Sequence, residues 1–343
     1  MAGCAEILPA CPAVRPRLGF VGVGWIGAHR MQALASSAAA EIVALTDSNA
    51  DAARNALRQL EQWAPRARIE SFTNLLDASL DGIVIATPNA EHAWQSRAAL
   101  ERGCAVFCQK PLARTYAEAR EVVATARRVD RLLDVDFCYR KVGGVDQLKS
   151  LVRTGALGEV FAAELVFHNA YGPDKPWFYD VASSGGGCST DLGIHLLDLL
   201  LWVLDYPVIE SVQSRLYRNG SLLPKPIAAV EDYALAELRV AGGLAARLAC
   251  SWKLSAGCDA VIEASFFGTR GAARLRNVNG SFYDFRVEHC EGTRTRALSV
   301  PADTWGGIAI CDWARQLAHS AAFDASAEHL PEVHRLLDAI YGR

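Results

Sequence analysis

Three features are missing from this 343-residue sequence, and each absence narrows what the protein can be. No apolar run reaches the roughly 18 residues that a membrane-spanning helix needs. Neither sign of charge dominates, because 35 Lys and Arg stand against 38 Asp and Glu. No C-x-x-C pair or accompanying His cluster occurs among the ten cysteines, so no metal site is expected. We therefore expect a soluble protein with neither nucleic acid nor a membrane as its partner.

The composition describes a well-buried globular chain. Apolar residues make up 51% of the sequence and charged residues 21%, which excludes disordered tails, collagen and coiled-coil rods. At about 150 residues per domain the length predicts two domains. Residues 1–16 lack both an apolar targeting segment and a twin-arginine pair, so we expect a flexible tail. Unpaired cysteines can be buried as small apolar residues, which favours the cytoplasm.

Residues 17–138 alternate short apolar runs with helical stretches. The predicted strands are Leu18–Val21, Ile42–Thr46, Ile83–Ala86, Ala105–Phe107 and Leu132–Asp136, with helices near 27–38, 50–63, 89–102 and 115–130. Because strand and helix alternate, the strands should pair in parallel with helices on both faces. Right-handed crossovers then predict a doubly wound Rossmann domain over residues 17–138.

A different pattern begins after residue 138. The predicted elements are helices near 143–154, 188–205, 304–321 and 328–340, and strands at 158–168, Tyr233–Val240, Leu244–Trp252 and Ala260–Phe267. In the last three strands every second residue is apolar, which indicates a sheet with one face against a core. Residues 139–343 are therefore predicted to form an α+β domain.

A glycine-rich turn follows the first predicted strand. The motif is Gly22-x-Gly24-x-x-Gly27, with Trp25 and Ile26 between its last two glycines. The glycines allow a tight turn, a close approach of the backbone to a pyrophosphate and close packing of the helix on the strand. The helix N-terminus offers N–H donors to the phosphates.

The next predicted strand ends near Asp47, 23 residues after Gly24, where a carboxylate accepts hydrogen bonds from a ribose. A carboxylate also repels a 2′-phosphate, so NAD is the predicted cofactor. Arg54 lies farther along the following helix and keeps NADP possible.

Polar residues follow two further strands of the predicted parallel sheet. Thr87, Pro88, Asn89 and His92 come after one strand, and Gln109, Lys110 and Pro111 come after the next. Residues just beyond the carboxyl ends of parallel strands face the ligand crevice. We therefore place these residues, with the glycine motif, at the cofactor. A solvated lysine and a polar residue in the first turn of a helix are the ordinary alternatives for Lys110 and His92.

An apolar helix of the second domain carries three ionisable residues. Asp191, His195 and Asp198 fall within about 60° of one another at ~100° per residue, while most other positions between 188 and 205 are apolar. Charged groups on such a helix are costly unless they are paired or face a wet cleft. The stripe indicates a site, and a structural His satisfied by two carboxylates is the alternative.

Taken together, these motifs resemble the Gfo/Idh/MocA family of NAD(P)-dependent oxidoreductases, which act on sugars and cyclitols. The resemblance rests on the glycine motif, on Cys108-Gln109-Lys110-Pro111, and on Gly185-Gly186-Gly187 followed by Asp191-x-Gly193-x-His195-x-x-Asp198. It implies a Rossmann domain followed by an open α+β domain with a large, mainly antiparallel sheet, through which a homodimer or homotetramer forms. It also implies that Lys110, Asp191 and His195 are catalytic.

One position departs from the family pattern. The glutamate that usually precedes the lysine is Gln109 here, and glutamine removes a negative neighbour of the Lys110 ammonium. We hypothesise that this ammonium keeps its proton less strongly than in relatives with glutamate. Gln109→Glu would then shift the basic limb of the pH–rate profile upward.

The predicted reaction is hydride transfer between the nicotinamide and a secondary alcohol or ketone of a polyhydroxylated small molecule. His195 would be the general base for oxidation. Lys110 would stabilise the reacting oxygen, and Asp191 would contact substrate or orient this pair. The predicted substrate ligands are these three residues together with Tyr139, Arg140 and Trp177. Asp198 is expected to support His195 or its helix.

Two other functions remain open at this point. Some members of the family use a bound NAD transiently to cleave glycosidic bonds, so a glycosidase or lyase is possible. A regulatory protein that binds NAD without chemistry is the second alternative. The presence of Lys110, Asp191 and His195 together argues against that second function.

Overall fold

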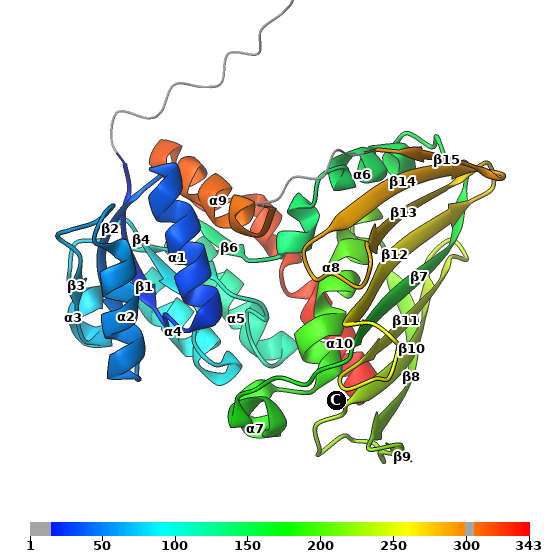
Figure 1. Cartoon of the computed structure of the whole chain (residues 1–343), viewed down its shortest axis with the longest axis horizontal. Helices are drawn as coiled ribbons and strands as arrows, with labels where there is room; N and C mark the ends of the chain where they lie inside the picture. The colour runs from blue at the N-terminus through cyan, green and yellow to red at the C-terminus, as the bar shows by residue number, and fades with distance from the viewer. Residues whose placement is uncertain (1–14, 299–304) are drawn as a thin grey trace, which may run out of the picture.

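The structure is a computed structural model that describes residues 15–298 and 305–343. Most of the expected N-terminal tail (residues 1–14) and the first residue of the helix predicted at 304–321 lie outside the described residues. The chain forms two lobes, each built on one sheet (Figure 1).

The first lobe contains a six-stranded sheet in the order β3-β2-β1-β4-β5-β6, in which every strand pair is parallel. Its strands are β1 (Arg17–Val21), β2 (Glu41–Thr46), β3 (Arg68–Ile69), β4 (Gly82–Ile85), β5 (Ala105–Cys108) and β6 (Leu133–Val135). The strand order reverses between β1 and β4, and ligands of such sheets bind beyond the strand ends at that point. The predicted Rossmann sheet is confirmed.

Five helices connect these strands: α1 (Trp25–Ser37), α2 (Ala50–Leu60), α3 (Phe72–Leu76), α4 (Asn89–Glu101) and α5 (Tyr116–Arg128). The N-termini of α2 and α5 are capped by the side chains of Asn49 and Thr115. The N-terminus of α1 has Gly24 at its cap and no side-chain hydrogen bond. Its first N–H groups therefore remain available to a ligand.

The second lobe contains a nine-stranded sheet in the order β15-β14-β13-β12-β7-β11-β10-β8-β9. Its strands are β7 (Val160–Asn169), β8 (Ile209–Arg218), β9 (Ser221–Leu222), β10 (Tyr233–Val240), β11 (Ala245–Ser251), β12 (Ala260–Gly268), β13 (Ala272–Asn277), β14 (Phe285–Glu291) and β15 (Arg294–Ala297). Only the central β7–β11 pair is parallel. The mainly antiparallel sheet is therefore confirmed, with five more strands than the sequence pattern indicated.

Helices α6 (Val145–Arg153), α8 (Ile194–Val203) and α10 (Glu332–Tyr341) pack against strands of this second sheet and cover one of its faces (Figure 1). In contrast, α9 (Ile308–His319) returns to the first lobe, where Trp313 packs beside Phe107. None of the helices in the two described stretches is long and apolar enough to cross a membrane.

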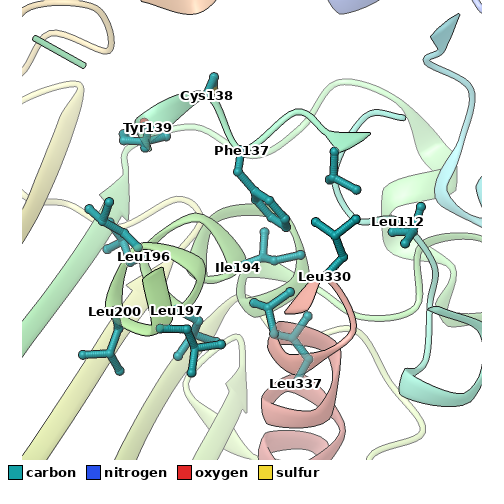
Figure 2. Packing of buried hydrophobic residues seen from close by; sticks show 14 of the residues in the cluster. Leu112, Phe137, Cys138, Tyr139, Ile194, Leu196, Leu197, Leu200, Leu330 and Leu337 are labelled. Atoms are coloured by element: carbon teal, nitrogen blue, oxygen red, sulfur yellow. The ribbon is translucent and has the colours of Figure 1, made fainter. Parts of the chain in front are cut away.

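A hydrophobic core at the junction joins the two lobes (Figure 2). Leu112 follows β5, Phe137 follows β6, Ile194 begins α8, and Leu330 and Leu337 come from the C-terminal segment. All five side chains are buried. Because Ile194 adjoins His195, this apolar packing fixes the start of α8 relative to the first sheet.

Candidate active site

A cavity of about 1640 Å³ lies between the two lobes. Most of the residues that the sequence predicted for the site line it, namely Gly22, Gly24, Trp25, Ile26, Asp47, Thr87, Pro88, Asn89, His92, Gln109, Lys110, Tyr139, Trp177, Asp191 and His195. Two predicted residues, Gly27 and Arg140, do not line it. Segments that are distant in the sequence therefore meet at one cavity.

The glycine-rich turn forms a cradle at one end of this cavity. Gly22 has a φ of +84°, and a Cβ there would lie 2.5 Å from the carbonyl oxygen of Ala86. Among the described residues other than its chain neighbours, a Cβ at Gly24 would meet one heavy atom within 4 Å, the Nζ of Lys175. Gly27 instead allows α1 to pack closely on the turn, because a Cβ added at this position would lie 2.2 Å from the carbonyl oxygen of Gly22.

The open space at Gly24 and the uncapped N-terminus of α1 fit the pyrophosphate of a dinucleotide, since backbone N–H groups and the positive end of the helix dipole both face it. Asp47 stands at the end of β2 beside this cradle. Its Oδ2 accepts from the backbone N–H of Val23 at 2.8 Å, and its Oδ1 accepts from that of Asn49 at 2.8 Å. Asp47 therefore shapes the glycine turn as well as facing the cavity.

Lys110 and Asp191 form an ion pair across the junction of the two lobes. The Lys110 Nζ donates to Asp191 Oδ1 at 2.9 Å and to the Asp191 carbonyl oxygen at 2.6 Å. Trp252, at the end of β11, donates from its Nε1 to the other carboxylate oxygen at 3.1 Å. No motif in the sequence marks Trp252, because only the register of β11 brings its indole to this carboxylate.

His195 is 8% exposed and lines the cavity from α8. Burial, reinforced by the positive charges of Lys110 and Arg30, holds the pKa of His195 well below its ordinary value of 6.5. The ring is therefore neutral near pH 7 and can accept a proton. The Tyr139 ring packs at 4.8 Å between centroids, and among the described residues the imidazole Nδ1 has no hydrogen-bond partner.

Of the three residues in the predicted stripe, Asp198 does not line the cavity. A wider π-helical turn, Ser189–Gly193, precedes α8 and changes the spacing between Asp191 and His195, whereas His195 and Asp198 keep regular α-helical spacing within α8. Asp191 and His195 line the cavity, whereas Asp198 lies nearly a turn farther along the helix axis and is 3% exposed. Burial raises its pKa, although the neighbouring Arg140 opposes that rise.

Arg140 does not occupy the position expected of a substrate ligand. Its Nε and Nη2 donate to the two carboxylate oxygens of Asp198 at 2.8 and 2.5 Å, and Nη2 also lies 3.1 Å from the Tyr206 hydroxyl. Two of the three guanidinium nitrogens thus donate inside the protein. Asp198 correspondingly supports Arg140 rather than His195.

Gln109 belongs to a buried polar cluster that lines the cavity. Its Nε2 donates to Asp136 Oδ2 at 2.5 Å, and the Arg30 Nε donates to the same oxygen at 2.5 Å. Gln109, Arg30 and Asp136 are 6%, 5% and 1% exposed. The sequence suggested that Gln109 deprives Lys110 of a negative neighbour, and the structure places the Asp136 carboxylate beside Gln109.

His92 and Asn89 hold the loops that border the cofactor end of the cavity. The two ring nitrogens of His92 lie 2.6 Å from the carbonyl oxygen of Pro111 and 2.7 Å from that of Thr87. Burial lowers the pKa of His92. Asn89 donates from Nδ2 to the carbonyl oxygen of Ser184 at 2.7 Å and so links α4 to the second lobe.

Aromatic side chains form part of the cavity wall, which we call the aromatic wall. Trp177 and Phe178, in the short turn Pro176–Tyr179, stack with 3.8 Å between their ring centroids, and both line the cavity. Tyr139 lines it from the first turn after β6. Aromatic rings pack well against the C–H faces of ring-shaped polyols.

Comparisons with known proteins match both lobes. A family model described as an oxidoreductase family with an NAD-binding Rossmann fold matches residues 16–137, and a GFO/IDH/MocA C-terminal domain model matches residues 145–274. An oxidoreductase subunit of Amycolatopsis mediterranei (strain S699) is 30% identical over 334 residues, which are 91% of this chain and 89% of that protein.

Other curated relatives align over shorter regions. The D-glucoside 3-dehydrogenase of Escherichia coli (strain K12) is 31% identical over 59% of this chain and 60% of its own length. The glucose-6-phosphate 3-dehydrogenase of Bacillus subtilis (strain 168) is 30% identical over 64% of this chain and 62% of its own length. The chain therefore aligns with about three fifths of the length of these two relatives.

Among solved structures, levoglucosan dehydrogenase in complex with NADH and levoglucosan superposes with a TM-score of 0.79 at 20% identity, over 95% of this chain and 96% of that one. The gentamicin-biosynthesis protein GenD2 in complex with NAD gives a TM-score of 0.78 at 20% identity, over 96% and 94% of the two chains. At this identity the two structures establish the shared fold.

Gln109→Glu should destabilise the protein in a pH-dependent way. The new carboxylate would face Asp136 in a buried position, so its pKa in the folded state would be raised. A raised folded-state pKa leaves stability intact below the unfolded-state pKa of about 4.3 and removes it as the pH rises. Urea denaturation at pH 7 should show a loss of about 1–3 kcal/mol.

Gln109→Met is the matched control, because it removes the donor without adding charge. Its smaller loss of stability should not change between pH 4 and pH 7. Equal and pH-independent losses in the two variants would contradict the placement of Gln109 against the Asp136 carboxylate.

Proposed function

Because the chain belongs to the Gfo/Idh/MocA oxidoreductase family, we propose that it is an NAD-dependent dehydrogenase. In this proposal it transfers a hydride between the cofactor and a secondary alcohol or ketone of a sugar, sugar derivative or cyclitol. The observation that carries the proposal is the convergence of Lys110, Asp191 and His195 on the cavity that also contains the glycine-rich cradle.

Lys110 is the proposed ligand of the reacting oxygen. An ammonium has three N–H donors, and Asp191 accepts two of them through its carboxylate and its carbonyl oxygen. The third can donate to the substrate oxygen and stabilise the negative charge that develops on it. Asp191, itself fixed by Trp252, is the residue that aims this donor.

His195 is the proposed general base for oxidation and general acid for reduction. Its lowered pKa keeps the imidazole neutral near pH 7, so it can take the hydroxyl proton without first losing one. When bound, the nicotinamide supplies the hydride acceptor or donor. The protein contributes the positions of both proton-handling groups and the buried surroundings in which they act.

The residues around Asp47 support NAD rather than NADP. The Asp47 carboxylate lines the cavity next to Ser48 and would repel a phosphate on the adenosine ribose. Arg54, which could have bound that phosphate, instead lies 2.6 Å from Asp51 on its own helix. NADP remains the second choice of cofactor.

A polyhydroxylated substrate is supported by Trp177 and Phe178 of the aromatic wall, which line the same cavity as the ionisable groups. Relatives that carry the names D-glucoside 3-dehydrogenase, glucose-6-phosphate 3-dehydrogenase and inositol 2-dehydrogenase support the same class. The choice among sugars and cyclitols, and the carbon that is oxidised, would follow from a substrate screen.

We also propose that the protein is cytoplasmic and forms a homodimer or homotetramer through the second sheet. Val166, Ala249 and Leu235 pair side by side across β7, β11 and β10, at positions that alternate with the core residues Leu165, Leu248 and Ala234 and so lie on the other face of the sheet. Light scattering should therefore give at least twice the mass of one chain, and Leu235→Glu should reduce it. A monomeric wild-type protein would contradict this interface.

Turnover with NAD and a panel of glycosides, sugars and inositols should release NADH, measured at its absorbance band. Lys110→Met and His195→Asn should each lower kcat/KM by about 10²–10⁴-fold, while NADH binding persists. Product formation without net NADH would instead indicate transient redox chemistry of the glycosidase type. NADH binding without turnover on every substrate would indicate a regulatory protein.

The ionisation of His195 provides a test that needs no substrate. In an NMR titration its pKa should lie well below 6.5, because burial and Lys110 both disfavour the charged ring. Lys110→Met should raise this pKa partway, since the larger contribution of burial remains. Lys141→Met, which removes a cation paired with Asp312, is the control and should leave the pKa unchanged. An unshifted His195 in the wild-type protein would contradict the geometry.

A further inference from the structure

A lysine of the second lobe stands over the glycine-rich turn of the first. Residues 170–175 connect β7 to the turn Pro176–Tyr179, and Pro173, Asp174 and Lys175 line the cavity. A Cβ built on Gly24 would lie 3.1 Å from the Lys175 Nζ, and apart from the chain neighbours of Gly24 no other heavy atom of residues 15–298 and 305–343 would lie within 4 Å of it. The ammonium therefore occupies the rim of the space that the glycines leave open.

Hydrogen bonds on both sides of Lys175 hold this loop in place. The Tyr171 hydroxyl donates to Asp259 at 2.6 Å, and the Tyr171 N–H donates to the side chain of Asn169 at 2.7 Å. The Tyr179 hydroxyl donates to the carbonyl oxygen of Pro173 at 3.0 Å. The chain is thus anchored through Tyr171, four residues before Lys175, and the bond between Tyr179 and Pro173 closes the loop around Lys175.

Lys175 also lacks an acidic partner within the described part of the chain. No carboxylate there lies within 4.0 Å of its ammonium. The nearest acid in sequence is Asp174, and Asp47 faces the same cavity with both oxygens engaged by backbone N–H groups. A cation at an uncapped helix N-terminus repels the helix dipole unless an anion lies between them.

We propose that Lys175 is a phosphate ligand of the dinucleotide, supplied by the second lobe. The inference rests on the proposed function, because it assumes that a dinucleotide occupies the cradle. The pyrophosphate would then be held between the N–H groups at the start of α1 and the ammonium of Lys175. A phosphate on the substrate has the same chemistry and is the other ligand that this ammonium could bind.

The position of Lys175 in the chain gives this contact a second consequence. Trp177 and Phe178 follow within three residues, in the turn that forms the aromatic wall. A phosphate bound to Lys175 would therefore restrain the segment that faces the substrate. Cofactor binding and the shape of the substrate end of the cavity are coupled through one short stretch of chain.

The experiment measures binding without turnover. Fluorescence titration with NADH, and competition by ADP-ribose and by adenosine, compare ligands with and without the pyrophosphate. Lys175→Met should weaken NADH and ADP-ribose about tenfold, leave adenosine unchanged and make NADH binding less dependent on salt. Lys175→Arg should retain most of the affinity. Lys225→Met, an exposed lysine that donates to Ser214 outside the cavity, is the control and should bind all three ligands as the wild type does.

An unchanged affinity of Lys175→Met for ADP-ribose would overturn the proposal, and so would an equal loss for adenosine. A rise confined to the KM for a sugar phosphate would also overturn it, because it would assign Lys175 to the substrate. A wild-type protein that binds NADH but oxidises no sugar or cyclitol would contradict the proposed function alone. The two proposals therefore fail on different measurements.

Discussion

The site depends on one ion pair that joins the lobes. Lys110 follows a strand of the first sheet, and Asp191 lies 81 residues later in the π-helical turn before α8. Each side chain is less than a fifth exposed, so the pair is stronger than a surface ion pair but also costs desolvation. Trp252 and the Asp191 carbonyl oxygen offset part of that cost. The ammonium thereby gains a fixed direction, which a solvated lysine would lack.

The segment that carries Asp191 is held by another buried carboxylate. Glu231 accepts from the N–H groups of Gly187 and Ser189 at 2.9 and 2.8 Å, and from the Tyr341 hydroxyl at 2.9 Å. Burial raises its pKa, while these donors oppose the rise. The Cβ of any residue other than glycine at position 187 would lie 1.9 Å from the Glu231 carbonyl oxygen. The three-glycine run therefore serves close packing behind the site rather than contact with a ligand.

Sequence patterns predicted the features that depend on residues close together in the chain. They missed the contacts that depend on how distant segments pack. Short motifs of a few residues each were enough to predict the glycine turn, the parallel strands and the positions of Lys110 and Asp191. Strand β8 was missed because only two of its ten residues are buried, which leaves a weak alternation. The partners of Arg140 and Asp191 were missed because Asp198 and Trp252 reach them only through the packing of α8 and the register of β11.

Gln109 shows how a substitution read from sequence changes its meaning in the folded protein. Taken alone, it removes a negative charge from the neighbourhood of Lys110. In the structure its amide donates to the buried carboxylate of Asp136, which Arg30 also binds. The charge thus lies on the adjacent strand end, compensated by a guanidinium, and a glutamine is the residue that can donate to it. A glutamate at 109 would place two carboxylates together beneath Lys110, so residues 30, 109 and 136 form one electrostatic unit whose members are not exchangeable singly.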